Sequence, residues 1–334
     1  MHPSSTTVPV PAWLRAWAVL TVLAAIPLAI LGAEVTTKGV GMVDPVGFRS
    51  PLHLFTQALP EGSWLGYVIE HGHRVAGFLV GTCCIVLAVG LGFFARGAFY
   101  RSLGVVALLA VIAQGMLGIF RVDLNALFGR DLAMIHGAFA QLVFATLTAV
   151  AVLVSRTWSS TATAPYPGTR GMALALCVVL YVQIVFGAIT RHRLDPLAQR
   201  LHILLAFAAV LLVFWLLQRL RDNRADRASL RFGYVLAAVV LLQPILGVEA
   251  WISRFGAGVL PELVASTPWS DLVRSGHHFL GTIIFCLSVA VAVLLRRPIP
   301  LAADRPLDSR WLDTAIADKA LQDRTERLRV GEHV

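Results

Sequence analysis

Four histidines occupy matching positions in this chain, and their surroundings suit the binding of hemes. Each lies at the start of a long apolar segment and is followed four residues later by a small residue. The histidines are His73, His136, His202 and His277, and the small residues are Gly77, Ala140, Ala206 and Gly281. An imidazole at a helix end can reach a heme iron, and a small residue one turn further leaves room for a flat macrocycle. Because ionisable groups inside membrane segments are candidates for function, we interpret the four histidines as heme ligands.

The composition is that of a membrane protein. Of the 334 residues, 57% are hydrophobic and only 14% are charged, and the mean hydropathy of +0.74 excludes an ordinary soluble domain. Eight apolar segments approach the roughly 20 residues that span a bilayer. They cover Trp13–Ala33, Ile69–Phe94, Leu103–Phe120, Leu132–Val154, Met172–Ile189, Leu201–Leu217, Phe232–Trp251 and His277–Leu295. We therefore predict an all-α integral membrane protein with eight transmembrane helices.

A repeated unit organises these segments. In three copies the pattern Gln-x-x-x-Gly is followed by a loop and then by one of the four histidines. The three Gln and Gly pairs are Gln114 and Gly118, Gln183 and Gly187, and Gln243 and Gly247. In the first copy Leu28 replaces the glutamine, while Gly32 keeps its place. Each unit predicts an αα-hairpin, so the chain is expected to form two pseudo-symmetric four-helix bundles.

The boundaries of these bundles follow from a change in composition. The segment Ser155–Arg170 is rich in Ser, Thr, Pro and Gly, which is typical of a linker. We expect an N-terminal bundle over residues 1–154, a cytoplasmic linker over 155–170, a C-terminal bundle over 171–297 and a polar cytoplasmic tail over 298–334.

Pairing within each half would give two heme sites. Because successive helices alternate in direction, all four histidines are expected near the extracytoplasmic side. His73 with His136, and His202 with His277, could each hold one iron, and two imidazoles give low-spin iron suited to electron transfer.

Other histidines have weaker claims. Counting back four residues from the small residue excludes His71 and His278, and His53 and His192 fall in predicted loops.

The net charge of +9 reflects membrane topology rather than a nucleic-acid partner. Arginines flank the helices mainly on one side, which places both termini in the cytoplasm. These arginines are Arg96, Arg101, Arg156, Arg170, Arg219, Arg221, Arg224, Arg227, Arg231, Arg296 and Arg297. The opposite side keeps a second basic set, for which two interpretations stay open: solvation with pairing to loop acids, or neutralisation of heme propionates. This set is Lys38, Arg49, Arg74, Arg121, Arg130, Arg191, Arg193, Arg200, Arg254 and Arg274.

Glu70 is the acid best placed for chemistry. It lies three residues before His73, so the two side chains share one helix face a turn apart. The carboxylate could favour the helix N-terminus, or it could act as a proton acceptor or cation stabiliser beside a bound porphyrin. The other three histidines have no acid at this offset, which suggests a catalytic N-terminal half and an electron-transfer C-terminal half. A di-iron carboxylate site would need a second Glu-x-x-His motif and further inward acids, so we reject it.

Three smaller features complete the reading. All four cysteines fall in apolar segments, so no extracytoplasmic disulfide is expected. Glu249 is either a proton relay or an interfacial residue. The turn-rich segment Gly39–Pro45 is either a lid over the N-terminal site or an ordinary loop.

The combination of these motifs resembles the heme A synthase family over about residues 13–297. The resemblance rests on the outer loop Val35–Pro45, the run Glu70-His71-Gly72-His73-Arg74, and the single histidines that open the later helices. It implies two pseudo-symmetric four-helix bundles and oxidation of the C8 methyl group of heme O to the formyl group of heme A, with water as the oxygen source. It also implies a role in cytochrome oxidase assembly.

The resemblance further assigns roles to individual residues. Glu70 matches the catalytic glutamate, His73 and His136 match the axial ligands of the substrate heme, and His202 and His277 match those of a b-type heme. Some family members carry paired cysteines in outer loops, and this chain has none there, so a thiol role does not carry over.

The leading hypothesis is therefore a heme-modifying enzyme in the cell inner membrane. Its expected partners are membrane lipid, heme O delivered by a heme O synthase, an electron acceptor that the sequence does not identify, and further copies of the chain. Two alternatives are a di-heme b-type cytochrome that transfers electrons from quinol, and a non-enzymatic heme carrier. Glu70 and the unequal halves favour the enzyme.

Overall fold

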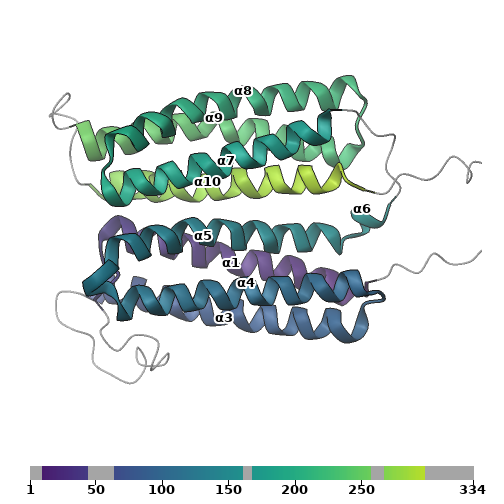
Figure 1. Ribbon diagram of the computed structural model, residues 1–334, viewed down its shortest axis with the longest axis horizontal. Coiled ribbons are helices and arrows are strands. Elements are labelled where there is room, and N and C mark those ends of the chain that lie inside the picture. The colour runs from purple at the N-terminus through teal and green to yellow at the C-terminus, as the bar shows by residue number, and fades with distance from the viewer. Residues whose placement is uncertain (1–9, 44–63, 161–167, 257–266, 298–334) are drawn as a thin grey trace, which may run out of the picture. The chain divides into compact units, whose positions relative to one another are not determined.

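The computed structural model describes residues 10–43, 64–160, 168–256 and 267–297, and within them every regular element is a helix. Eight of these helices are long and apolar enough to cross a membrane, which confirms the predicted all-α, multi-pass membrane protein (Figure 1). The eight are α1 (Ala12–Lys38), α3 (Trp64–Phe94), α4 (Ala98–Asp123), α5 (Asn125–Leu153), α7 (Thr169–Arg193), α8 (Pro196–Asp222), α9 (Arg227–Phe255) and α10 (Pro268–Leu294). A short helix, α6 (Arg156–Ser159), lies in the predicted linker.

The helices extend further than the hydropathy pattern predicts, mostly at the ends that carry the histidines. For example, α3 begins at Trp64 rather than Ile69, and α10 begins at Pro268 rather than His277. The prediction that each histidine opens its helix is therefore wrong, since His277 lies more than two turns inside α10. The physical reason is that a helix need not stop where the apolar stretch stops, because its first turns can stand in the polar interface.

Local sequence explains where the later helices begin. The Asp195 carboxylate accepts a hydrogen bond of 2.7 Å from the Ala198 backbone N–H and so caps α8. Thr267 and Ser270 form a reciprocal capping box at the start of α10, and a proline follows the cap in both helices. These caps fix the start of the two helices that carry His202 and His277.

Helix contacts connect the long helices into two groups of four. In the first group α1 packs on α3, α3 on α4, α4 on α5, and α5 on α1. In the second, α7 packs on α8, α8 on α9, α9 on α10, and α10 on α7. Contacts of α10 with α1 and α5, and of α5 with α7, join the groups within one compact unit that ends at Arg297. The pseudo-symmetry of the two groups and the proposed domain limits stay predictions, and the tail 298–334 lies outside the described residues.

Packing follows the rules for helices in lipid. Many buried positions hold alanine, including Ala18, Ala107, Ala173 and Ala290, which lets the backbones approach closely. Large apolar side chains such as Phe93, which is 81% exposed, point away from neighbouring helices. In a bilayer these side chains would face the lipid tails.

Candidate functional site

The structure brings the four predicted histidines together in the two expected pairs. The ring centroids of His73 and His136 are 6.5 Å apart, with the planes at 78°. Those of His202 and His277 are 6.2 Å apart, with the planes at 76°. One pair lies within each group of four helices.

This separation fits a metal ion held between two imidazoles. A metal–imidazole nitrogen bond is about 2 Å long and the ring centre lies about 1 Å further, so two such rings have centres about 6 Å apart. Among the described residues, no group of three or more His, Cys, Asp and Glu side chains could hold a metal ion. The donors therefore suit a heme, whose macrocycle supplies the other four nitrogens, better than a metal bound by protein alone.

Hydrogen bonds to the preceding helix fix the orientation of three of the rings. The Nδ1–H groups of His73, His202 and His277 donate to backbone carbonyl oxygens at 3.0, 2.8 and 3.2 Å. The acceptors are the carbonyls of Leu28, Gln183 and Gln243. Because a carbonyl only accepts, Nδ1 must carry the proton, so Nε2 keeps a free lone pair for a ligand.

A glycine on the preceding helix supports each ring from the side. A Cβ atom built at Gly32 would lie 2.8 Å from Cε1 of His73, and one at Gly187 would lie 2.7 Å from Cε1 of His202. The corresponding distances are 3.3 Å from Gly118 to His136 and 3.0 Å from Gly247 to His277. The sequence marked these glycines as part of the repeat without giving them a role; the structure shows that they make room for the imidazoles.

The repeated glutamines attach the histidine helices to the helices before them. Gln114, Gln183 and Gln243 each donate from Nε2 to the backbone carbonyl of the following histidine, at 3.1, 3.3 and 2.9 Å. Gln114 Nε2 also lies 3.2 Å from both ring nitrogens of His136. In the first copy Leu28 has no side-chain donor, and only its backbone carbonyl holds His73.

Glu70 is buried near the first pair and is not isolated. It is 3% exposed, and its Oε1 accepts from Nη2 of Arg74 at 2.8 Å. Arg121, at the end of α4, interacts electrostatically with both Glu70 and Arg74 and with His136. From sequence alone, Arg74 and Arg121 could be assigned only to the outer basic set, because no spacing rule links α4 to α3.

Residues 40–43, the described part of the loop after α1, lie against Arg121 and the first turn of α3. Gly39 ends α1 with a left-handed φ of 67°. Val40 and Val43 then pack against Gly66 of α3, and the Gly41 carbonyl accepts from Arg121. A side chain at Gly41 would collide with that guanidinium. Residues 40–43 thus pack on the ends of α3 and α4 near the first histidine pair, and the choice between a lid and an ordinary loop stays open; Asp44 and Pro45 lie outside the described residues.

The remaining described histidines contact other groups. The His71 ring is buried and stacks on Tyr67, with centroids 5.8 Å apart. His278 lies 3.4 Å, Nε2 to Nε2, from Gln141 of α5. His192 belongs to the last turn of α7 rather than to a loop, which corrects the sequence-based assignment. His53 lies outside the described residues.

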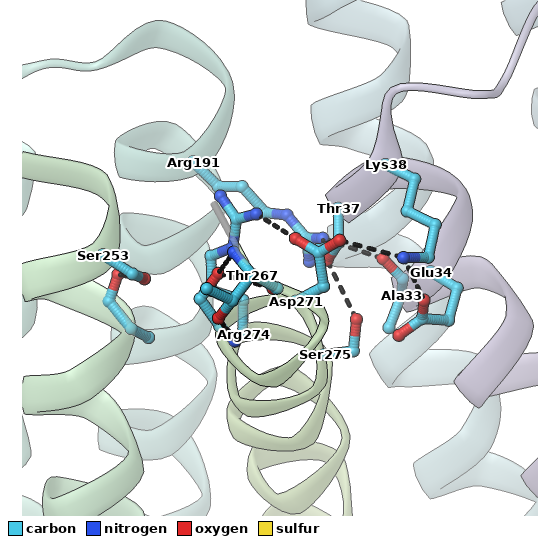
Figure 2. A network of polar contacts seen from close by, with 12 residues as sticks. Ala33, Glu34, Thr37, Lys38, Arg191, Ser253, Thr267, Asp271, Arg274 and Ser275 are labelled. Carbon is cyan, nitrogen blue, oxygen red and sulfur yellow. Dashed lines mark hydrogen bonds and ion pairs between the residues drawn. The ribbon is translucent and has the colours of Figure 1, made fainter. Parts of the chain in front are cut away.

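A polar network joins the two groups of helices at the end that carries the histidines (Figure 2). Arg191 of α7 donates from Nη2 to the Ala33 carbonyl at 2.9 Å and to the Thr37 hydroxyl at 2.7 Å, both on α1. Lys38 pairs with Asp271 of α10 at 2.9 Å. Ser275, two residues before His277, donates to Thr37 at 3.0 Å. The network therefore connects α1, whose Leu28 carbonyl accepts from His73, to α10, which carries His277.

Comparison with known families places the first pair in context. The sequence model of a family described as cytochrome oxidase assembly protein matches residues 61–199. This match to the COX15-CtaA model covers less than half of the chain. For that segment it confirms the resemblance to heme A synthases and points to cytochrome oxidase assembly. The matched COX15-CtaA segment contains Glu70, His73 and His136, whereas His202 and His277 lie beyond it. No curated protein matched the chain.

Proposed function

We propose that this protein oxidises the C8 methyl group of heme O to a formyl group, which gives heme A for cytochrome oxidase. The observation that carries the proposal is the position of Glu70: a buried carboxylate three residues before a paired histidine, in the segment that matches the cytochrome oxidase assembly family. In the second pair, Gln199 and Arg274 stand at the same offset from His202 and His277. A carboxylate at this offset therefore distinguishes the first pair from the second.

The reaction sets the tasks of the protein. Converting a methyl to a formyl group with water as the oxygen source removes four electrons and four protons. Positive charge develops on the methyl carbon as electrons leave, and a fixed carboxylate close by would stabilise that charge. Glu70 would stabilise the positive charge on the methyl carbon and accept a proton from the incoming water. Arg74 and Arg121 would fix the Glu70 carboxylate in place and limit its motion.

The second pair would have a different task. His202 and His277 would hold a b-type heme, which when bound supplies one-electron transfer between the substrate site and an acceptor outside the chain. Their environment supports this role because it offers paired imidazoles without a nearby carboxylate at the Glu70 offset. We further propose a location in the cell inner membrane with both termini cytoplasmic, delivery of heme O by a heme O synthase, and association with further copies of the chain.

The alternative is a di-heme b-type cytochrome that transfers electrons from quinol. The similar geometry of the two pairs favours it, since an electron wire would need two equivalent sites. It would, however, give no role to a buried carboxylate beside one pair only.

The test that separates these functions is Glu70→Gln, which keeps the shape of the side chain and removes its charge. The variant is expressed in cells that lack their own heme A synthase, and the extracted pigments are separated by mass. We expect the variant to retain heme and to accumulate heme O or a hydroxylated intermediate, with the rate of heme A formation lowered by about 10²–10³-fold.

The matched control is Asp131→Asn, which removes an outer acid that pairs with Arg193 at an exposed position of α5. It should form heme A at the normal rate. Normal heme A yield from Glu70→Gln would show that the carboxylate is structural and would favour the di-heme cytochrome.

A further inference from the structure

Two buried hydrogen-bond donors have no acceptor at the outer end of the second histidine pair. Nε of Arg274 and Nε1 of Trp251 are both inaccessible to solvent, and neither has a partner among the described residues. An unsatisfied buried donor is unfavourable, more so in a charged group, and native proteins rarely leave one without a reason.

The two donors lie close to the groups that cradle the second pair. Arg274 is three residues before His277 on α10, one turn toward the outer end of the helix. Trp251 is four residues after Gly247 on α9, the glycine that supports the His277 ring. Because α9 and α10 pack together, both N–H groups lie one turn outward from the candidate iron position.

A third donor comes from the neighbouring helix. Arg191 is four residues after Gly187, the glycine that supports His202. Among the described residues it donates to the neutral oxygens of Ala33 and Thr37, and it interacts repulsively with Arg254 and Arg274. The acids nearby are Glu34 and Asp271, and Asp271 is already shared between Lys38 and Arg274 (Figure 2).

Several arginines held together in a poorly solvated region repel one another unless an anion lies among them. A carboxylate would satisfy both orphaned donors and offset the excess positive charge, since arginine binds carboxylates with well-matched geometry. The carboxylate must also extend from the bound macrocycle to the outer end of the second histidine pair.

We infer that Arg274 and Trp251, with Arg191 behind them, form a carboxylate-binding site that takes the propionate groups of the b-type heme. The inference rests on the proposed function, because it requires a heme on His202 and His277. For this site it selects neutralisation of heme propionates over pairing with loop acids, the two interpretations that the sequence left open for the outer basic residues. The equivalent positions near the first pair differ, since Ala133 of α5 replaces the arginine and Val122 of α4 replaces the tryptophan.

The experiment uses the purified full-length holoprotein and three variants. Arg274→Gln removes the charge, and Trp251→Phe removes one N–H while it keeps the ring and leaves the Arg274–Asp271 ion pair intact. Arg193→Gln is the control, because that arginine is exposed and pairs with Asp131 away from the donors. The first readout is the rate at which heme b transfers to apomyoglobin.

The second readout is the redox-induced infrared difference spectrum of protein loaded with heme that is ¹³C-labelled at the propionate carboxyls. The band of the second heme is the one that His277→Ala removes. This readout reports the carboxylate directly, whereas a purely structural role of Arg274 would not change it.

We expect Arg274→Gln and Trp251→Phe to release heme b about tenfold faster or more, as the loss of one charge-assisted hydrogen bond predicts, and to shift the labelled carboxylate band. A band shift without faster release would still support the site. Unchanged bands in both variants would overturn it, whether or not release is faster. Full heme b content in His277→Ala would instead contradict the proposed function.

Discussion

Contacts with the helix before it position each imidazole, so the protein itself orients the candidate ligands. His202 is the clearest case, because its Nδ1 donates to the Gln183 carbonyl and its Cε1 lies against Gly187. Preorganised ligands lose little freedom on binding, which favours tight and specific coordination.

Gly187→Ala tests this support. The added Cβ would lie 2.7 Å from His202 Cε1, too close for the ring to stay, so the ring must move away from the Gln183 carbonyl. We expect loss of low-spin heme from the second site, measured by the heme-to-protein ratio and the reduced absorption spectrum, with a small change in thermal stability.

Gly171→Ala is its control on the same helix, because a Cβ there meets nothing within 4 Å. It should keep full heme content. Equal heme content in both variants would mean that the glycine does not position His202.

Residue spacing predicted the histidine register but not the partners that lie across helices. The repeat selected His73 and His277 rather than their neighbours His71 and His278, because a helical register depends only on local sequence, and the structure pairs these two rings with His136 and His202. Arg121 could not be linked to Glu70 in this way, since the two residues come from different helices. The same limit hid the contacts of Arg191 with α1.

At the scale of the helix, hydropathy predicted the number of spans and missed their ends. α3, α8 and α10 begin before their apolar stretches. In α8 and α10, capping residues and prolines rather than hydrophobicity decide the first turn. As a result, the histidines lie inside helices rather than at frayed helix ends. Helical residues on both sides of each histidine then hold it in place.

At the opposite end of the helices, the buried Arg297 connects the start of α9 with α6. Arg297, after α10, contacts the Asp226 carboxylate, and its Nη1 donates to the Thr157 carbonyl near α6 at 3.2 Å. Asp226 also caps α9 through the backbone N–H groups of Ala228 and Ser229. Partial burial alone would raise the pKa of Asp226, but hydrogen bonds from Ser229 and the charge of Arg297 lower it below its ordinary value.

Asp226→Asn should therefore reduce stability in a pH-dependent way. Asparagine keeps the helix cap but loses the ion pair. Because the folded-state pKa of Asp226 is lowered, its contribution is fully present above the unfolded value of about 4 and is lost as the pH falls through the folded value. Thermal unfolding in detergent should show a lower melting temperature for the variant at pH 7, with the difference disappearing at the acid end. A difference that does not shrink as the pH falls through the lowered folded-state pKa of Asp226 would refute the ion pair.

For the whole molecule, eight candidate spans in the described residues put both ends of the α1–α10 segment on one side of the membrane. We propose from the arginine distribution that this side is cytoplasmic. We expect Met42→Cys, in the first outer loop, to react with an impermeant thiol reagent in intact cells, and Ser159→Cys to react only after permeabilisation.

The background for this labelling is low, because the four native cysteines all lie within the spans and none is exposed. The reverse labelling pattern would place both histidine pairs near the cytoplasm and would refute the proposed orientation.

The central claim is that two histidine pairs hold two different hemes in one chain, and pigment stoichiometry tests it most directly. Purified protein is compared with His73→Ala and His277→Ala by mass spectrometry of extracted hemes per chain. We predict one heme b and one heme O or heme A in the unaltered protein, loss of heme b alone from His277→Ala, and loss of heme O and heme A alone from His73→Ala. Loss of the same pigment from both variants, or a single heme per chain throughout, would contradict the account.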